Sequence, residues 1–327
     1  MIKTLSIGHA SYELYIQVDE FPKENEYFRF VNKIGCGGGN ASNVAYLLAK
    51  WGVGSTFAGT LGNDMYGNRI LKEFESVGVD TRYVETTYDK DTTVSTVIVN
   101  QKNGSSTLFN IADEYVKLRK FDFDFQPDLI FVDGHDSYAS KSTMERFPKA
   151  KTIISCTRNV NEVIDVAKMC EYMICNQTFA ESVTNLKIDF SNSATLVNAF
   201  DALRKKFDRQ HVIVTLGDHG ALYQVDNQIK VSPALKVNPS DTTGAKDVFD
   251  GAFAYAITQE YTVEQAVRFA NIAAGLSTQM IGTRKSIPKL QDVSKIYNEK
   301  INWSVYHKSS SFRFTWWNKR YNFLLNI

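Results

Sequence analysis

The stretch from residue 241 to residue 257, DTTGAKDVFDGAFAYAI, brings a carboxylate, an ammonium group and a glycine together. The apolar residues after Asp247 have helical spacing, so Asp247 is expected to be the second residue of a helix. The first N–H groups of a helix lack intrahelical acceptors and attract anions. A carboxylate there can take a proton from an attacking hydroxyl while the N–H groups stabilise a phosphoryl group during its transfer.

An ordinary helix start explains the same residues equally well. Asp247 would then only stabilise the helix dipole, and Thr243 would cap the helix. The stretch by itself does not decide between a catalytic base and a cap.

A second glycine-rich stretch, GCGGGNASN at 35–43, also precedes a predicted helix. Glycines allow a ligand to approach the backbone, and Asn43 can both donate to and accept from hydroxyl groups. Alone, such a run is also typical of a simple turn. The chain contains no GxxxxGK[ST], which excludes a P-loop NTPase, and the run does not match GxGxxG.

Short and almost wholly apolar strands alternate with helices after residue 125, which indicates a parallel sheet that is covered on both faces. Residues 12–19, 26–34, 92–100 and 105–111 instead alternate polar and apolar side chains, as in a sheet with one exposed face. The prediction is a doubly wound, Rossmann-like α/β fold with a small β-sheet lid. The predicted boundaries are 1–11, 35–90 and 112–303 for the core, 12–34 and 91–111 for the lid, and 304–327 for an irregular basic and aromatic tail.

The composition excludes several classes of function. Lys and Arg number 37 against 36 Asp and Glu, so no net field attracts nucleic acid or an anionic membrane. We find neither a signal peptide nor an apolar run long enough to span a membrane. The four cysteines lack CxxC spacing and the histidines lack HExxH, so we expect reduced thiols in a cytoplasmic protein and no transition-metal site.

The two glycine-containing stretches together resemble the signatures of the ribokinase-like (PfkB) carbohydrate kinases. GGGNASNVAYLLAKWG matches the first and DTTGAKDVFDGAF the second, and the resemblance covers about residues 1–300. It implies a kinase that uses ATP and Mg²⁺ to phosphorylate a hydroxymethyl group of a sugar or nucleoside. It also implies a ribokinase-like core whose lid makes a homodimer contact. The balanced charge separately predicts no nucleic-acid or membrane partner.

The resemblance assigns roles to individual residues. Asp247 matches the base, and the backbone of Gly244, Ala245 and Lys246 matches the anion hole for the phosphoryl group. The residues that it implies for the other ligands are Glu13, Gly38, Gly39 and Asn43 for the sugar, Asn176, Thr215, Gly217, Gly220 and Asn271 for the nucleotide, and Asp241, Thr243, Gly282 and Ser286 for a monovalent cation such as K⁺.

Three positions depart from the pattern of this family. Lys246 stands where a glycine is usual, and its ammonium group would be tolerated, would help to bind phosphate, or would weaken the site. Phe179 replaces a glutamate that organises Mg²⁺, with Glu181 as the nearest acidic alternative. Glu13 replaces an aspartate, and is either a sugar ligand in a reshaped pocket or a solvated strand residue.

These observations favour a sugar kinase with Asp247 as its base. A nucleoside kinase on the same fold is the second hypothesis. A binding protein that has lost catalysis is the third, and Lys246 and Phe179 are the reason to consider it.

Overall fold

The computed structural model describes residues 2–30, 32–110, 116–208 and 211–308, with the backbone alone for 300–308. No helix within these ranges is both long enough and apolar enough to cross a membrane. The last helix, α9 (Leu290–Lys308), continues into the segment that was predicted to be an irregular tail. The rest of that tail, 309–327, lies outside the described residues.

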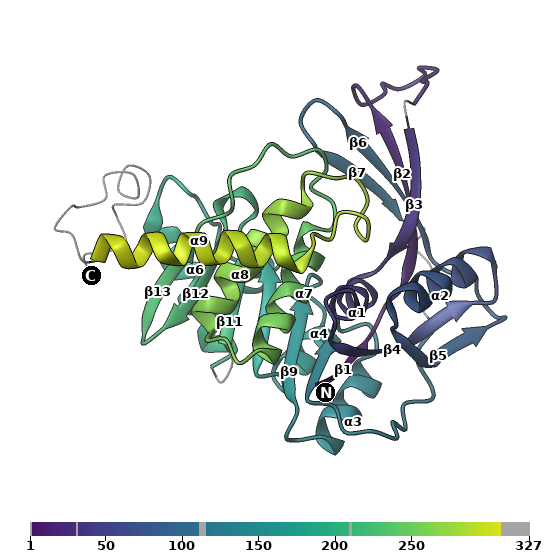
Figure 1. Cartoon of the computed structure of the whole chain (residues 1–327), viewed down its shortest axis with the longest axis horizontal. Coiled ribbons are helices and arrows are strands. Elements are labelled where there is room, and N and C mark those ends of the chain that lie inside the picture. Colours follow the sequence, from purple (N-terminus) through teal and green to yellow (C-terminus); the bar gives the residue numbers. More distant parts are fainter. Residues whose placement is uncertain (1, 31, 111–115, 209–210, 309–327) are drawn as a thin grey trace.

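A nine-stranded sheet forms the centre of the molecule (Figure 1). Its strands run in the order β13-β12-β11-β10-β9-β8-β1-β4-β5. All neighbouring pairs from β11 to β5 are parallel, and β12 and β13 add an antiparallel edge. The strands are β1 (Lys3–Ile7), β4 (Gly54–Gly62), β5 (Asp80–Thr87), β8 (Leu129–Val132), β9 (Lys151–Cys156), β10 (Tyr172–Asn176), β11 (His211–Thr215), β12 (Ala221–Val225) and β13 (Gln228–Ser232).

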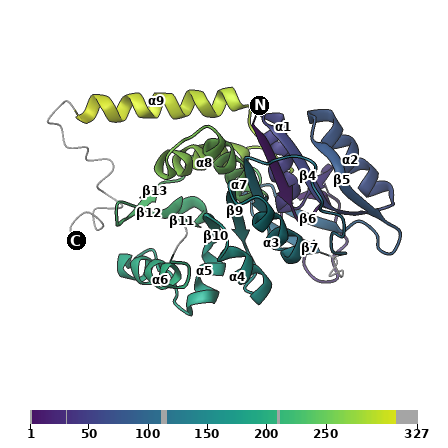
Figure 2. The same ribbon diagram turned by 90° about the horizontal axis from the view of Figure 1, so that it is seen from below.

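Helices cover both faces of this sheet, as Figure 2 shows. Two separate apolar cores fill the space between the sheet and the two helix layers, because side chains of successive strand residues point to opposite faces. The predicted doubly wound α/β fold is thus confirmed. One layer holds α1 (Asn40–Lys50), α2 (Met65–Val77), α7 (Ala245–Thr258), α8 (Val263–Ser277) and α9, and the other holds α3 (Ser137–Arg146), α4 (Asn161–Ala167), α5 (Gln177–Thr184) and α6 (Ser193–Lys206).

A second sheet of four strands projects from the core beside α1 and α2 (Figure 1). Its order is β3-β2-β6-β7, so two hairpins from distant parts of the chain meet through β2 and β6. The strands are β2 (Ser11–Val18), β3 (Asn32–Gly38), β6 (Val94–Asn100) and β7 (Ser106–Asn110).

Residues 35–38 of the glycine-rich run lie inside β3 rather than in a loop. Residues 26–30, which were predicted to begin this strand, are not part of it. These glycines are needed because side chains from neighbouring elements lie against the strand. A Cβ on Gly35 would stand 2.6 Å from the Tyr12 hydroxyl, and one on Gly37 would stand 2.2 Å from the Arg284 guanidinium. Extended backbone without side chains therefore lets the second sheet lie against the core.

Candidate active site

Asp247 lies in the first turn of α7, although its position differs slightly from the prediction. The N-cap is Gly244, in a left-handed conformation with φ of 75°, so Asp247 is the third helical residue and not the second. No side chain caps the helix, so the interpretation of Thr243 as the cap is wrong. Glycine adopts this conformation without steric cost. It therefore allows the loop to turn directly into the helix.

The Asp247 carboxylate faces the start of α1 instead of its own helix. Asn40 Nδ2 donates to Asp247 Oδ1 at 2.7 Å, and Asn43 Nδ2 donates to Asp247 Oδ2 at 2.7 Å. The two asparagines stand three residues apart on α1, which places them on one face of that helix. The structure thus joins the two glycine-containing stretches into one site.

The surroundings of Asp247 favour its protonated form. Partial burial raises the pKa of this carboxyl, the hydrogen bonds from Asn40 and Asn43 lower it, and the charge of Asp250 raises it again. Lys246 has a smaller lowering effect on the same pKa. The net shift is upward, which makes Asp247 a stronger base than an exposed aspartate.

Lys246 has ordinary helical geometry, but its ammonium group points toward another carboxylate. Lys246 Nζ forms an ion pair with Asp250 Oδ2 at 2.8 Å and also donates to Ser155 Oγ at the end of β9. Asp250 is completely buried. Sequence reasoning missed Asp250, although its i, i+4 spacing from Lys246 was a usable signal.

Arg284, between α8 and α9, is a second residue that the sequence analysis missed. It is 2% exposed and forms an ion pair with Glu73 Oε2 at 2.8 Å. Its Nε donates to Asn43 Oδ1 at 3.2 Å. Arg284 therefore holds the Asn43 amide with its nitrogen toward Asp247. An arginine in an irregular segment carries no local pattern that predicts such burial.

Glu13 is a buried member of the same region and not a solvated strand residue. It accepts hydrogen bonds from the Tyr15 hydroxyl and, at 3.1 Å, from Thr283 Oγ1. Burial, opposed by the Tyr15 hydrogen bond, raises the pKa of Glu13 to about 7. Gly38 lies directly over this carboxyl, where a Cβ would come within 2.3 Å of the Glu13 Cδ. Gly39 follows as the N-cap of α1 with φ of 88°.

The residues predicted to face the nucleotide gather beyond the ends of β11 and β13. Thr215 ends β11, and Gly217 and Gly220 both have positive φ in the short turn that follows. A Cβ on Gly220 would stand 2.0 Å from the carbonyl oxygen of Ser232, the last residue of β13. Asn271 on α8 donates to that same carbonyl at 2.9 Å. The turn and α8 are thus joined through Ser232.

The residues expected near Mg²⁺ do not supply a carboxylate for it. Asn176 is the N-cap of α5 and accepts from the backbone N–H of Phe179 at 2.8 Å. Phe179 is buried in the apolar core. Glu181 accepts from Lys187 and from two further donors, which lower its pKa. No cluster of three or more His, Cys, Asp or Glu side chains suited to a metal occurs in the described ranges.

The two loops predicted to hold a monovalent cation lie side by side. Asp241 is buried, and its carboxylate accepts from the backbone N–H of Thr243 at 2.9 Å and of Gly282 at 3.1 Å. No lysine or arginine pairs with Asp241 in the part of the chain that the structure describes. Ser286 instead donates to the carbonyl oxygen of Thr283. The uncompensated carboxylate suits a cation bound by oxygen atoms.

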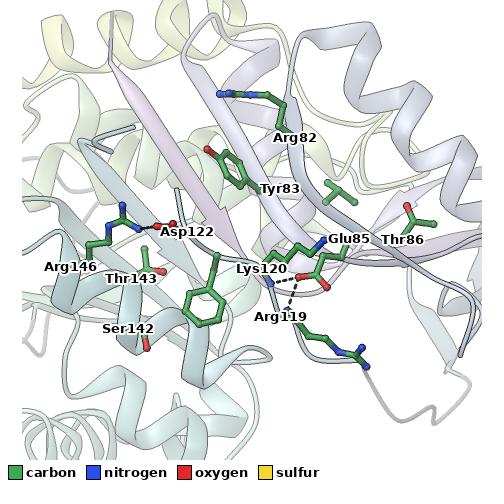
Figure 3. A pocket seen from close by; sticks show the side chains of 12 residues that line it. Arg82, Tyr83, Glu85, Thr86, Arg119, Lys120, Asp122, Ser142, Thr143 and Arg146 are labelled. Atoms are coloured by element: carbon green, nitrogen blue, oxygen red, sulfur yellow. Dashed lines mark hydrogen bonds and ion pairs between the residues drawn. The ribbon is translucent and has the colours of Figure 1, made fainter. Parts of the chain in front are cut away.

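A separate pocket of about 890 Å³ opens beside β5 and α3, and none of the predicted site residues lines it (Figure 3). Two of its basic side chains already have acidic partners: Arg82 with Asp80, and Arg146 with Asp122. The Glu85 carboxylate, which faces the same pocket, accepts from backbone N–H groups at 119 and 120.

Comparison with known proteins agrees with this arrangement. The model of the pfkB family of carbohydrate kinases matches residues 1–290. The chain belongs to that family. It is 27% identical over 307 residues to a deoxyribokinase of Salmonella typhi, covering 88% of this chain and 96% of that protein. It is also 26% identical over 314 residues to a ribokinase of Dictyostelium discoideum, covering 88% and 98%.

Solved structures share the fold of this chain. The ribokinase of Arabidopsis thaliana complexed with ribose and ATP superimposes with a TM-score of 0.72. It shares 21% sequence identity with this chain, over 91% of the chain and 99% of the ribokinase. Membership of the family makes this protein a phosphotransferase with an alcohol group as acceptor.

Proposed function

We propose that the protein transfers the γ-phosphoryl group of ATP to a primary hydroxyl of a small sugar, with Asp247 as the base. The observation that carries this proposal is the orientation of Asp247. Its carboxylate is held by two amides from α1, beside the first N–H groups of α7, which no side chain caps. A base and an anion-binding helix end thus lie together, as phosphoryl transfer to a hydroxyl requires.

A pentose is the acceptor that we expect. The curated relatives are named deoxyribokinase and ribokinase, and the Arabidopsis thaliana ribokinase was solved with ribose. Gly38 and Gly39 lie beside Asn43 and the buried Glu13. These groups offer both donors and acceptors for sugar hydroxyls. A nucleoside acceptor is the alternative that substrate screening would reveal.

ATP is proposed to lie along the turn after β11, with Thr215, Gly217 and Gly220 near its phosphates and Asn271 near its base. Gly244, Ala245 and Lys246 would present backbone N–H groups to the transferred phosphoryl. Since Phe179 and Glu181 are not available as ligands, Mg²⁺ would be held by the nucleotide phosphates and water.

A potassium ion is proposed beside Asp241, next to Thr243, Gly282 and Ser286. A buried carboxylate with no basic partner among the described residues supports this assignment, and the cation would also order the loop that leads into α7. Turnover in KCl should therefore exceed turnover in tetramethylammonium chloride of equal concentration.

The lid is proposed to form a homodimer contact. Every residue of the edge strand β7 is exposed, including Leu108 and Phe109. An exposed edge strand with apolar side chains is suited to pairing with a second copy. We also propose a cytoplasmic location, since all four cysteines are unpaired and buried.

The first test is ADP release from ATP and Mg²⁺ with ribose, deoxyribose, ketoses, aminosugars and nucleosides. Turnover with one acceptor should fall by about 10²–10⁴-fold in Asp247→Asn. Asp165→Asn, an exposed position on α4, is the matched control and should leave the rate unchanged. ATP-dependent thermal stabilisation without turnover for any acceptor would instead identify a binding protein that has lost catalysis.

A further inference from the structure

Asp250 is a buried carboxylate whose charge has one basic partner. Its Oδ2 accepts from Lys246 Nζ at 2.8 Å, Ser155 Oγ at 2.7 Å and Asn40 Nδ2 at 2.8 Å. Its Oδ1 is buried and has no hydrogen-bond partner among the described residues. A buried carboxylate is unstable without such compensation. Lys246 therefore supplies the opposite charge that this buried carboxylate needs.

Asn40 connects this ion pair to the base. An amide nitrogen carries two hydrogens, and Asn40 Nδ2 gives one to Asp250 Oδ2 and the other to Asp247 Oδ1. The direction in which the amide faces is thus set by both carboxylates together. Moving Asp250, or changing its charge, changes the hydrogen bond that holds Asp247.

Charged groups of both signs face Asp247 from several elements. The lysine nearest to it is already paired, so its field and that of its carboxylate partner largely cancel at Asp247. The charged groups around Asp247 are Lys246 and Asp250 on α7, Glu13 on β2, and Arg284 between α8 and α9 with its partner Glu73 on α2.

We propose that the side chains of Lys246 and Asp250 are positioning groups that orient Asp247 through the Asn40 amide, and that the Lys246 ammonium group does not bind the transferred phosphoryl group. This inference rests on the proposed role of Asp247 as the base. It explains why a lysine occurs where the family pattern has a glycine. The lysine and the aspartate one turn later form one unit, and its effect reaches Asp247 across the interface between α7 and α1.

The test is the pH profile of kcat/KM for the acceptor in Lys246→Met, Asp250→Asn and the double variant. Lys246→Met leaves Asp250 unpaired, so Asp247 binds its proton more tightly and the acidic limb should move to higher pH by about one unit. Above the shifted limb, kcat/KM of Lys246→Met should return to nearly the wild-type value. Asp250→Asn should move the limb to lower pH, and the double variant should restore it. Lys295→Met, exposed on α9, is the control for losing a lysine.

Lys246→Arg keeps the charge and should keep the position of the limb, which tests the inference even if Lys246→Met folds poorly. A limb that is unchanged in Lys246→Met would overturn the proposal. So would a loss of kcat at every pH together with a raised KM for ATP, because this would assign Lys246 to phosphoryl binding.

Carbon-13 NMR of aspartate carboxyl groups makes the test independent of turnover. The Asp247 resonance is the one missing from Asp247→Asn, and its titration midpoint should follow the same order among the variants. If the wild-type protein phosphorylates no acceptor, the proposed function fails while these midpoints still decide the coupling. Identical midpoints in wild type and Lys246→Met would overturn it.

Discussion

Arg284 donates its Nε hydrogen to the side-chain oxygen of Asn43 and thereby determines which way the Asn43 amide faces. The guanidinium also lies 4.6 Å from the centre of the Phe74 ring and pairs with Glu73. One buried cation therefore supports the packing of α2 and the hydrogen bond to Asp247 at once.

Replacing Arg284 with methionine should reduce the free energy of unfolding by about 3–5 kcal/mol, because Glu73 is left without its cation. Urea unfolding provides the measurement. The double variant Arg284→Met/Glu73→Met should regain a substantial part of the loss. Equal stability of the single and double variants would show that the ion pair is not the cause.

Glu13 should make the stability of the protein depend on pH. Its pKa is raised by burial to about 7 in the folded protein, from an ordinary value of 4.5, so folding favours its protonated form. Its favourable contribution is complete below pH 4.5 and is lost as the pH rises through about 7. The wild-type protein should thus lose on the order of 2–3 kcal/mol relative to Glu13→Gln between pH 4.5 and 7.5.

The comparison of unfolding free energies must be made at several pH values, because Glu13→Gln also weakens the hydrogen bonds from Tyr15 and Thr283. The loss of these hydrogen bonds offsets the unfolding free energy of Glu13→Gln from that of the wild type by a constant amount. It does not make the two free energies diverge as the pH changes. Parallel curves across the interval would contradict a raised pKa of Glu13.

Gly38→Ala should impair the acceptor site selectively. The added Cβ would collide with the Glu13 carboxyl, and the side chain of Glu13 would have to move. We expect KM for the acceptor to rise about tenfold or more, equivalent to about 1.4 kcal/mol. The turn that we propose to bind the nucleotide lies elsewhere, so the Kd for ATP in calorimetry should stay within about twofold of wild type. A change in the Kd for ATP with an unchanged acceptor KM would refute this placement of the sugar.

Phe179 should behave as a core residue. It is 1% exposed, so Phe179→Ala should reduce the free energy of unfolding by about 3–5 kcal/mol. Phe179→Glu, which restores the acidic residue usual in the family, should be still less stable, because it buries an unpaired carboxylate. Chemical denaturation measures both, with Tyr138→Ala on the exposed face of α3 as control. A glutamate variant as stable as wild type would mean that this position is solvated.

The sequence was sufficient to predict the doubly wound α/β fold and the second sheet, and it singled out Asp247 and Asn43, which the structure joins by a hydrogen bond. Both residues lie in local patterns that are visible along the chain. The pairing of Asn40 with two carboxylates was not predictable, because it depends on how α1 and α7 pack against each other. The strand character of the glycine run was missed for a related reason, since side chains of Tyr12 and Arg284 from other elements explain it.

Asn43 and Asp247, which share a hydrogen bond, are separated by 204 positions in the chain. Contacts between such distant segments form late in folding, because a long loop must close before they become favourable. A nascent chain has no complete site until α7 has been synthesised and has docked onto α1. Recovery of activity after dilution from denaturant should accordingly trail the recovery of helical circular dichroism, so that enzymatic activity reports the final stage of assembly.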